Sequence, residues 1–414
     1  MQSPSKGRGQ GEFYRKPQGA TEKTPCTVER LAWGGKGVAR AGDGRLILLS
    51  APLALFPGEI VEAEIRWKPR HGEGDVRGWI RPDPRREPAG CPVARTCGGC
   101  DLWEAGSCAP GLKQAMVADL FARQLPGAPA WAWLEAPANA RRHRIQLHWT
   151  GRDLGFHRRG TNALVPVSAC PAAVPVLSAA IPRLQEALEA RILPSRPQRW
   201  ELVTGTPAGE VYAQDEQGKA WHLEPDGWHP YAGGVAHRLG QARLSHRPGG
   251  FFQVCPDWAW EAFGRILAGW DLPPGTLYDL YGGVGFFTAL MGGRVQRAVL
   301  VESDAPAVAW AQRNLEGTDA ECVAADAGEW MQEGLGLPGD LILLDPPRAG
   351  LAPEMCAKLQ DVGAEDLVLV GCDGAAFCRD LKRLEPAWRL EALAAADLFP
   401  NTVHVECVAW LRKA

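Results

Sequence analysis

Two short segments near the carboxyl end of the chain carry side chains suited to covalent chemistry. Cys372 follows the apolar run at residues 367–371 (LVLVG), and Asp345 follows residues 341–344 (LILL) at the start of the sequence DPPR. Such short apolar runs predict buried parallel strands, whose carboxyl ends meet at one edge of a sheet. Two prolines after Asp345 predict a rigid turn that presents Asp345 and Arg348 at that edge. We therefore expect Cys372 beside Asp345, where a thiolate could attack a carbon atom of a bound base.

A glutamate adds to this set at the end of residues 398–406 (LFPNTVHVE), whose alternation predicts a strand that carries Glu406 with His404 on the same face. Carbon 5 of a uracil ring is a poor nucleophile until a group adds to carbon 6, so a methyltransferase acting there needs a thiol. A base must then remove the proton from carbon 5 before the thiol leaves. Cys372 and Glu406 together suit these roles, although either residue alone is more often a buried apolar thiol or a solvated strand residue.

The preceding segments carry a pattern typical of a nucleotide cofactor site. Residues 276–280 (TLYDL) run into the glycine-rich turn at 281–285 (YGGVG), and Glu302 ends the next apolar run. Glycine lets a ligand approach the backbone, and an acid at that strand end can bind both ribose hydroxyls of an adenosine. Asp326 and Asp345 end the next two runs, although each of these acids would also suit a helix cap. Because the turn lacks a GxGxxG pyrophosphate loop, S-adenosylmethionine fits better than NAD.

Four cysteines form a candidate metal site. Cys91, Cys97 and Cys100 stand close together in CPVARTCGGC, and Cys170 follows in VPVSACP. Four thiolates can hold one soft metal centre, and the two glycines before Cys100 let the chain turn around it. Structural zinc usually takes two CxxC-type pairs and this chain has one, which favours an iron–sulfur cluster over zinc. Unligated thiols remain the alternative.

The elements that would position these residues fall into four segments. Residues 1–22 are predicted to be a basic flexible tail. Residues 23–82 alternate short apolar runs with WGGKG, AGDGR and LFPGE, which predicts a small five-stranded β-barrel. Residues 83–240 are interpreted as a mixed α+β domain that contains the four cysteines. Residues 241–414 alternate strand and helix patterns, which predicts an α/β catalytic domain with a parallel sheet.

Composition and charge narrow the class of protein further. No run of about 18 apolar residues is present, and the N-terminus lacks the apolar stretch of a secretory signal, so a cytoplasmic protein without membrane contact is expected. A net charge of −3 does not by itself indicate a nucleic-acid partner, but residues 141–160 hold six arginines against one aspartate. The candidate phosphate contacts, for which a solvated charged face is the alternative, are Arg141, Arg142, Arg144, Arg158 and Arg159, with His143, His148 and His157 among them.

Eight motifs in order resemble those of the bacterial RNA (uracil-5-)-methyltransferase family, and specifically its 23S ribosomal RNA members that carry a TRAM domain and a four-iron four-sulfur (4Fe-4S) cluster. These motifs are CPVARTCGGC, VPVSACP, GGFFQV, DLYGGVGFF, VLVES, LLDPPRAGL, GCDGAAFCRDL and DLFPNTVHVE, and the match runs from about residue 24 to the end. The resemblance implies a class I methyltransferase (Rossmann-like) catalytic domain and an N-terminal TRAM (OB-like) barrel. It also implies methylation of carbon 5 of a specific uridine in 23S rRNA by S-adenosylmethionine.

The same resemblance assigns roles to individual residues. Cys372 would be the nucleophile, and Glu406 would be the base. Contacts to S-adenosylmethionine would come from Gln253, Tyr281, Glu302 and Asp345, and more weakly from Asp326. The cluster would be held by Cys91, Cys97, Cys100 and Cys170.

Some positions depart from the family pattern. The sequence GCDG at 371–374 stands where the family usually has SCNP, and FPNT replaces a usual FPQT. Gly282 replaces a usual Cys, Phe286 sits where some relatives have Asn, and Cys255 occupies a usual Asn position. The loss of Asn and Pro beside the nucleophile could alter its turn, although Asp373 keeps a polar group and Gly374 permits an unusual turn.

Three other interpretations stay open at this point. The same chemistry could act on transfer RNA, or the chain could be a catalytically silent RNA-binding or assembly factor. A DPP-type turn also occurs in N6-adenine methyltransferases, for which Cys372 and Glu406 would be dispensable. The sequence indicates no obligate protein partner.

Overall fold

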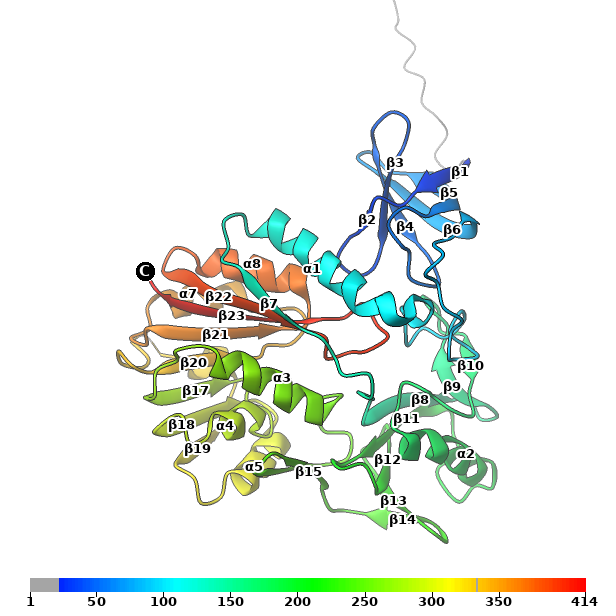
Figure 1. Ribbon diagram of the computed structural model, residues 1–414. Helices are drawn as coiled ribbons and strands as arrows, with labels where there is room; N and C mark the ends of the chain where they lie inside the picture. Colours follow the sequence, from blue (N-terminus) through cyan, green and yellow to red (C-terminus); the bar gives the residue numbers. More distant parts are fainter. Residues whose placement is uncertain (1–21, 333) are drawn as a thin grey trace, which may run out of the picture.

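The computed structural model describes residues 22–332 and 334–414 (Figure 1). The basic tail expected at the N-terminus therefore lies, apart from residue 22, outside the described residues. A small sheet formed by the first strands stands at one end of the molecule, above a central antiparallel sheet and a large mixed sheet that lie beside each other (Figure 1).

The N-terminal sheet has six strands in the order β1-β5-β6-β4-β3-β2, one more than the sequence predicts, and it is curled (Figure 1). Its strands are β1 (Glu22–Thr27), β2 (Arg30–Leu31), β3 (Gly37–Arg40), β4 (Leu46–Ser50), β5 (Ile60–Trp67) and β6 (Gly72–Arg81). Val61, Ala63 and Ile65 alternate inward along β5, as a half-buried strand requires. The AGDGR segment forms a tight turn between β3 and β4, in which Gly44 has a φ of 84° and Asp43 accepts a hydrogen bond from the backbone N of Arg45.

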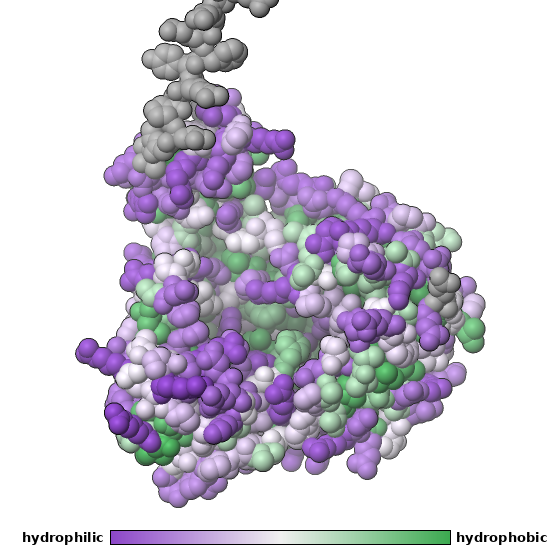
Figure 2. All heavy atoms as spheres, turned by 180° about the vertical axis from the view of Figure 1, so that it is seen from behind, coloured by the Kyte–Doolittle hydropathy of each residue, from purple (hydrophilic) through white to green (hydrophobic). Residues whose placement is uncertain are grey.

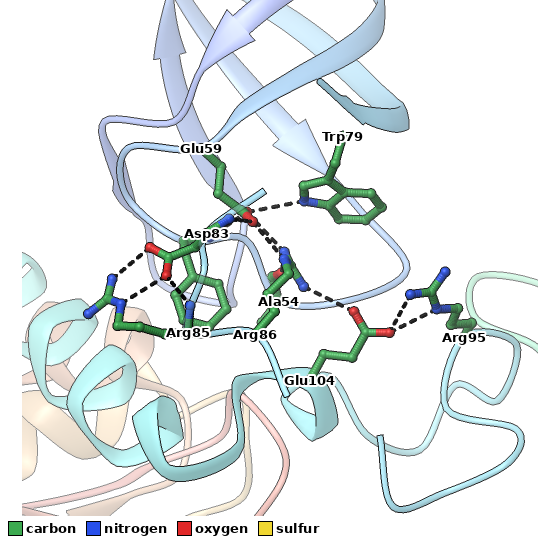
Figure 3. A network of polar contacts seen from close by, with 9 residues as sticks. Ala54, Glu59, Trp79, Asp83, Arg85, Arg86, Arg95 and Glu104 are labelled. Atoms are coloured by element: carbon green, nitrogen blue, oxygen red, sulfur yellow. Dashed lines mark hydrogen bonds and ion pairs between the residues drawn. The ribbon is translucent and has the colours of Figure 1, made fainter. Parts of the chain in front are cut away.

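A buried ion-pair network joins this sheet to the rest of the chain (Figure 3). The carboxylate of Glu59 accepts hydrogen bonds from Arg86, from Trp79 Nε1 and from the backbone N of Asp83. Burial alone would raise the pKa of Glu59, but these donors, Arg86 above all, hold it below its usual value. Arg86 also pairs with Glu104 in the short 3₁₀ helix η1 (Trp103–Cys108). Paired charges therefore connect the N-terminal sheet to η1.

The central sheet is antiparallel throughout, with the strand order β10-β9-β8-β11-β12-β13-β14. Its strands are β8 (Arg144–Trp149), β9 (Leu154–His157), β10 (Leu164–Pro166), β11 (Gln198–Thr204), β12 (Val211–Asp215), β13 (Ala220–Glu224) and β14 (Gly227–Tyr231). Helix α2 (Pro175–Glu189) covers one face, where Ile181 and Leu184 pack in one core with Trp200 and Leu202. A hairpin of β15 (Val235–Leu239) and β16 (Ala242–His246) leads out of this part.

The large sheet has eight strands in the order β19-β18-β17-β20-β21-β23-β22-β7. The parallel strands that the sequence predicts are confirmed as β17 (Thr276–Leu280), β18 (Arg297–Glu302), β19 (Ala320–Ala324), β20 (Leu341–Leu344) and β21 (Asp366–Gly371). Two further strands, β22 (Trp388–Ala396) and β23 (Glu406–Lys413), form an antiparallel pair, and β23 lies antiparallel to β21. Leu341 and Leu343 enter the core on one face while Ile342 and Leu344 enter the core on the other, so the sheet is covered on both sides.

Helices from several parts of the chain cover this sheet (Figure 1). They are α3 (Pro256–Ala268), α4 (Phe286–Met291), α5 (Ala305–Asn314), α6 (Ala327–Trp330), α7 (Pro353–Gln360) and α8 (Gly374–Leu384). The resulting architecture, a mainly parallel sheet with a core on both faces, is the α/β arrangement that the sequence predicts for this part of the chain.

The division of the chain differs from the predicted one in the segment 83–240. Helix α1 (Ala109–Gln124) packs against α8, and β7 (Trp131–Leu134) pairs in parallel with β22 at the edge of the large sheet. Burial explains this placement, because Leu112, Met116 and Leu120 belong to the same core as Phe377 and Leu381. Residues 109–134 thus belong to the large sheet and its covering helices, not to the central sheet.

No helix in the described ranges is long and apolar enough to cross a membrane. The face seen in Figure 2 is hollowed between the N-terminal sheet and the two larger layers, with apolar surface at the base of the hollow and hydrophilic side chains at its rim (Figure 2).

Candidate active site and metal centre

Three chain segments bring acid and thiol groups to one edge of the large sheet. Strands β20 and β21 are adjacent and parallel, so Asp345 and Cys372, which follow them, emerge at the same carboxyl edge. Strand β23 runs the opposite way, and its pairing of Cys407 with Gly371 puts its first residue, Glu406, at that edge too. The register across β20, β21 and β23 therefore brings together three side chains that are 27 to 61 residues apart in the sequence.

The segment before Glu406 is not the strand that its alternation predicts, and that prediction is wrong. Strand β23 begins only at Glu406, while Asn401 has a φ of 63° and Thr402 turns back to donate a hydrogen bond to the carbonyl O of Phe399. Other parts of the chain hold this segment. Lys113 donates to the carbonyl O of Phe399 at 3.0 Å, and Asp101 accepts from the backbone N of Val403 at 3.2 Å. Tertiary hydrogen bonds, not sheet pairing, fix the approach to Glu406.

His404 also differs from its predicted place, because it lies in this irregular segment rather than on a strand face. Its ring Nε2 is 3.4 Å from Nη2 of Arg348, the arginine of the DPPR turn. Arg348 thus stands between the two segments that carry the candidate nucleophile and the candidate base.

Burial and mutual repulsion raise the pKa values of the acidic groups at this edge. Burial and, after it, the nearby Glu406 carboxylate raise the pKa of Cys372 to about 11, against the opposing effect of the Arg348 guanidinium. Burial, followed by the neighbouring Asp345, raises the pKa of Glu406 well above its usual value, and again Arg348 opposes the shift. Burial and then Asp279 raise the pKa of Asp345 to about 7. Such clusters of shifted groups are typical of reaction sites.

The glycine-rich turn after β17 lies beside this edge and has the backbone geometry of a ligand cradle. Tyr281 has a φ of 64°, which is unusual for a residue with a side chain, and the two glycines at 283 and 285 are also left-handed. The Glu302 carboxylate, at the end of β18, accepts from the backbone N of Gly283 at 3.1 Å and from the backbone N of Asp304 at 2.7 Å. These bonds hold Tyr281 and Glu302 in adjacent positions at the sheet edge.

Asp279 lies beneath the turn and was not singled out from the sequence. It is fully buried, and Thr288 donates two hydrogen bonds to its Oδ2. Its Oδ1 has no hydrogen-bond partner among the described residues, and burial raises its pKa to about 6. A buried acceptor without a partner, under a glycine turn, fits a cofactor that carries a positive charge.

The other two expected cofactor residues differ in their surroundings. Gln253 is half-buried in the extended segment before α3, and within residues 22–332 and 334–414 its side chain makes no hydrogen bond. Asp326 instead caps helix α6 by accepting from the backbone N of Glu329 at 3.0 Å, which is the alternative role considered for it. Phe251, two residues before Gln253, is 71% exposed. An exposed large aromatic ring can mark a binding surface, and the sequence alone does not show this exposure.

Packing accounts for two of the departures from the family pattern. A Cβ atom at Gly282 would lie 2.5 Å from Cγ of Leu300, so a side chain there requires the buried Leu300 side chain to shift. Phe286 is buried against Trp260, Phe263 and Phe287. Nothing in the structure explains Cys255, which is buried at the start of α3.

Cys91, Cys97, Cys100 and Cys170 line one cavity of about 440 Å³, together with apolar side chains that include Trp103 and Phe252. Four sulfurs around one zinc ion would lie about 3.8 Å apart, given Zn–S bonds of about 2.3 Å in a tetrahedron. In the described part of the chain no three of these sulfurs lie mutually within 4.8 Å. The four cysteines thus share one cavity, without three sulfurs at the spacing that a single zinc ion requires.

The arginines of residues 141–160 do not form one free basic face. Arg144 is paired with the buried Glu201 through two hydrogen bonds, and Arg159 is paired with Asp101. Arg142 lies beside the cysteine cavity, and Arg141 donates to the carbonyl O atoms of residues 138 and 140. Of the proposed phosphate contacts, these four arginines thus have structural partners or a place at the cavity.

Arg158 is exposed, and it lies with His148 and His157 in a surface groove of about 700 Å³. The two imidazole rings stack with their centroids 3.7 Å apart. His143, by contrast, is only 6% exposed and accepts or donates a hydrogen bond within the core, at 2.8 Å from the carbonyl O of Gly205, so it is not a surface contact.

The chain is similar along nearly its whole length to curated RNA methyltransferases. It is 30% identical to the 23S rRNA (uracil(1939)-C(5))-methyltransferase RlmD of Pseudomonas fluorescens (strain Pf0-1), with 94% of this chain and 91% of that protein covered. The chain belongs to the RNA (uracil-5-)-methyltransferase family. It is also 30% identical to an uncharacterized RNA methyltransferase of Streptomyces coelicolor, over 95% of this chain and 93% of that one.

Two further comparisons concern the carboxyl-terminal segment of the chain and its fold, which is the class I methyltransferase fold that the resemblance implies. The family model described as tRNA (Uracil-5-)-methyltransferase matches residues 338–414, which contain Asp345, Cys372 and Glu406. The tRNA (uracil-54, C5)-methyltransferase of Pyrococcus abyssi, solved in complex with S-adenosyl-L-homocysteine, has the same fold, with a TM-score of 0.71 and 23% identity over 94% of this chain and 99% of that one. The chain is an RNA methyltransferase that uses S-adenosylmethionine to methylate carbon 5 of uracil.

Proposed function

We propose that this enzyme methylates carbon 5 of a uridine in 23S rRNA, with Cys372 as the nucleophile and Glu406 as the base. The single observation that carries the assignment of roles is the meeting of Cys372 and Glu406 across the β21–β23 register. An N6-adenine methyltransferase needs neither residue, so this pairing favours uracil chemistry. The choice of 23S rRNA rests on the relatives named RlmD.

The residues of this edge would act in a fixed order. The Cys372 thiolate adds to carbon 6, and the electron pair of the C5–C6 double bond moves toward the oxygen on carbon 4. S-adenosylmethionine, when bound, supplies the methyl group that carbon 5 then takes. Glu406 next removes the proton from carbon 5, and the C6–S bond breaks as the double bond re-forms, which returns the thiolate. Arg348, beside both groups, stabilises the anionic form of each in turn.

The raised pKa of Glu406 suits its role, because a carboxylate with a higher pKa is a stronger base. The cofactor would be held by Tyr281, Glu302, Gln253 and Asp345, with its ribose hydroxyls at Glu302. Asp279 would add negative charge beneath the glycine turn, opposite the positive charge of the cofactor. Asp326 would have at most an indirect part, since it caps a helix.

The four cysteines would hold a 4Fe-4S cluster. The supporting observation is that all four cysteines line one cavity, where no three of their sulfurs lie within 4.8 Å of one another among the described residues. Each iron of such a cluster takes one thiolate, and Arg142 beside the cavity would offset the negative charge of the ligands. The cluster would fix the loop that carries Cys100 and Asp101, and Asp101 in turn holds Val403 near the base.

RNA would cross the hollowed face between the N-terminal sheet, which we assign as a TRAM domain, and the central sheet. Exposed Phe251 near Gln253 could stack on an unpaired base, and the groove with Arg158, His148 and His157 could take a phosphate and its nucleotide. Arg158→Ala is expected to weaken RNA binding and to reduce the salt dependence of that binding by about one phosphate contact.

The experiment that tests the proposed function is covalent trapping. Wild type and Cys372→Ala are incubated with S-adenosylmethionine and with 23S rRNA or tRNA transcripts in which 5-fluorouridine replaces uridine. Fluorine at carbon 5 cannot be removed as a proton, so a productive enzyme stays attached to its RNA through denaturing electrophoresis. We expect an adduct with 23S rRNA that requires both Cys372 and the cofactor.

Other results of this trapping experiment would overturn the proposal in defined ways. An adduct with tRNA alone would transfer the same chemistry to transfer RNA. Tight binding of either RNA without any adduct would indicate a silent RNA-binding factor. Metal analysis of protein purified without oxygen tests the cluster, for which about four irons per chain are expected and stoichiometric zinc without iron is the contrary result.

A further inference from the structure

A turn of the N-terminal sheet reaches across to the candidate nucleophile. The turn Ala32–Lys36 joins β2 to β3, and it is closed by backbone hydrogen bonds from Gly35 N to Ala32 O and from Ala32 N to Lys36 O. Its Trp33 ring lies against Gly374, the first residue of α8 and the second residue after Cys372. The N-terminal sheet thus contacts the nucleophile turn directly.

The contact between Trp33 and Gly374 leaves no room for a side chain. A Cβ atom added at Gly374 would lie 2.9 Å from Cη2 of Trp33 and 2.5 Å from Cδ2 of Leu120 in α1. The backbone of Gly374 does not have a positive φ, so glycine is not needed there for an unusual turn. Gly374 stands where the resembling family usually has proline, and the lack of a side chain there leaves room for the indole ring of Trp33 and for Leu120.

The same turn also touches the segment that leads to the candidate base. Gly35 approaches Val403 so closely that any Cβ at position 35 would overlap Cγ1 of Val403. Val403 precedes Glu406 by three residues, in the irregular segment that sheet pairing does not hold. One rigid turn therefore rests on both sides of the reactive pair.

We propose that Trp33 is a positioning residue for the reaction, and that the turn Ala32–Lys36 clamps the Cys372 turn against the segment before Glu406. This inference rests on the proposed roles of Cys372 and Glu406. The turn contacts both the Cys372 turn and the segment before Glu406. Among the described residues, no hydrogen bond joins these two segments to each other. The Asp373 side chain caps α8 through the backbone N of Ala376, so the helix start itself does not depend on Trp33.

Trp33→Ala tests the clamp, with Trp67→Ala as the matched control. Trp67 is a half-buried tryptophan of the same sheet, and it packs against Arg45 rather than against the catalytic turn. We expect Trp33→Ala to lower the single-turnover rate of adduct formation with 5-fluorouridine RNA by about 10- to 100-fold, because a displacement of about 1 Å at a reacting group has an effect of that size. The affinity for S-adenosylmethionine should stay unchanged, since Trp33 does not contact the glycine-rich turn. Trp33→Phe should recover most of the rate.

Alkylation of Cys372 by iodoacetamide, followed by mass spectrometry of its peptide, gives a second measurement that needs no RNA. Removal of the indole ring opens the turn, so Cys372 should react several-fold faster in Trp33→Ala, while the remote, half-exposed Cys322 of the same chain should be unchanged. If Trp33 positions Cys372, the variant should react faster with iodoacetamide but form the RNA adduct more slowly. General destabilisation of the protein would instead increase the alkylation rates of both Cys372 and Cys322.

Gly374→Ala provides the reciprocal test, with Gly111→Ala as its control because a Cβ at Gly111 meets no atom within 4 Å. Gly374→Ala should slow adduct formation in the wild-type background and should cost less in the Trp33→Ala background, since the two changes act on one contact. The clamp is refuted if Trp33→Ala matches Trp67→Ala in both the adduct rate and the alkylation ratio. If wild type itself forms no adduct, the proposed function fails, and the alkylation ratio then decides the clamp alone.

Discussion

Arg348 offers a test of how this edge of the sheet is tuned, through the variant Arg348→Met. Its guanidinium contacts the Cys372 thiol and lies near Glu406, and it lowers the pKa of both groups against the effect of burial. Methionine keeps the length and apolar part of the side chain but removes the charge. Loss of the positive charge must therefore raise both pKa values, starting for Cys372 from about 11.

The size of the effect follows from the type of contact. A hydrogen bond to a charged group contributes about 1.5–3 kcal/mol, and one pKa unit corresponds to about 1.4 kcal/mol. Arg348 is exposed, so solvent screening favours the lower end, or about one unit. Below its pKa, a rise of one unit lowers the thiolate fraction of Cys372 about tenfold at any given pH.

Two assays measure this shift. The rate of Cys372 alkylation and the single-turnover rate of methyl transfer are followed from pH 6 to 10, and each should rise with pH because Cys372 reacts as the thiolate. In Arg348→Met both curves should lie about tenfold lower at pH 8 and should reach the same rate about one pH unit higher. Arg297→Met, which removes an exposed arginine at the opposite end of the strands, is the control. Superimposable pH profiles for Arg348→Met and wild type would refute the reasoning.

Two further outcomes are expected. Glu406→Gln should allow addition of Cys372 and methylation but block removal of the carbon 5 proton, so a covalent complex should accumulate on ordinary uridine RNA. If denaturing gels show no such complex and turnover is retained, Glu406 is not the base. Lys113→Met should lower the free energy of unfolding by about 3–5 kcal/mol in urea titrations, because the Lys113 Nζ lies 2.5 Å from Asp397 Oδ1 in a pair that is 1% and 5% exposed. Adding Asp397→Asn to that variant should recover more than half of the loss, whereas additive losses would argue against an unpaired buried charge as the cause.

The sequence by itself determined the parallel part of the large sheet and the residues at its carboxyl edge. Short apolar runs between helical stretches specify buried parallel strands, and this is why Asp345 and Cys372 could be expected side by side. The order of motifs also determined the family. The apolar runs are local features of the sequence, and the order of the motifs is read along the chain. Neither requires knowledge of contacts between distant segments.

Alternation of apolar residues was misleading at residues 398–405, because the buried residues of the folded segment, Leu398, Thr402 and Val405, do not follow the period of two of a strand. The position of Glu406 is instead fixed by the antiparallel register of β23 against β21. The location of α1 and β7 in the catalytic part was likewise not legible, since their apolar faces do not say which core they join.

Only the tertiary structure decided how the reactive residues are held. Arg348 beside Cys372, Asp101 and Lys113 on the segment before Glu406, and the indole of Trp33 against Gly374 are all contacts between residues far apart in the chain. The sequence specified which chemical groups are present because residue types and strand periods are local properties. Their distances and pKa values depend on burial and on neighbours brought together by folding, and so they required the folded chain.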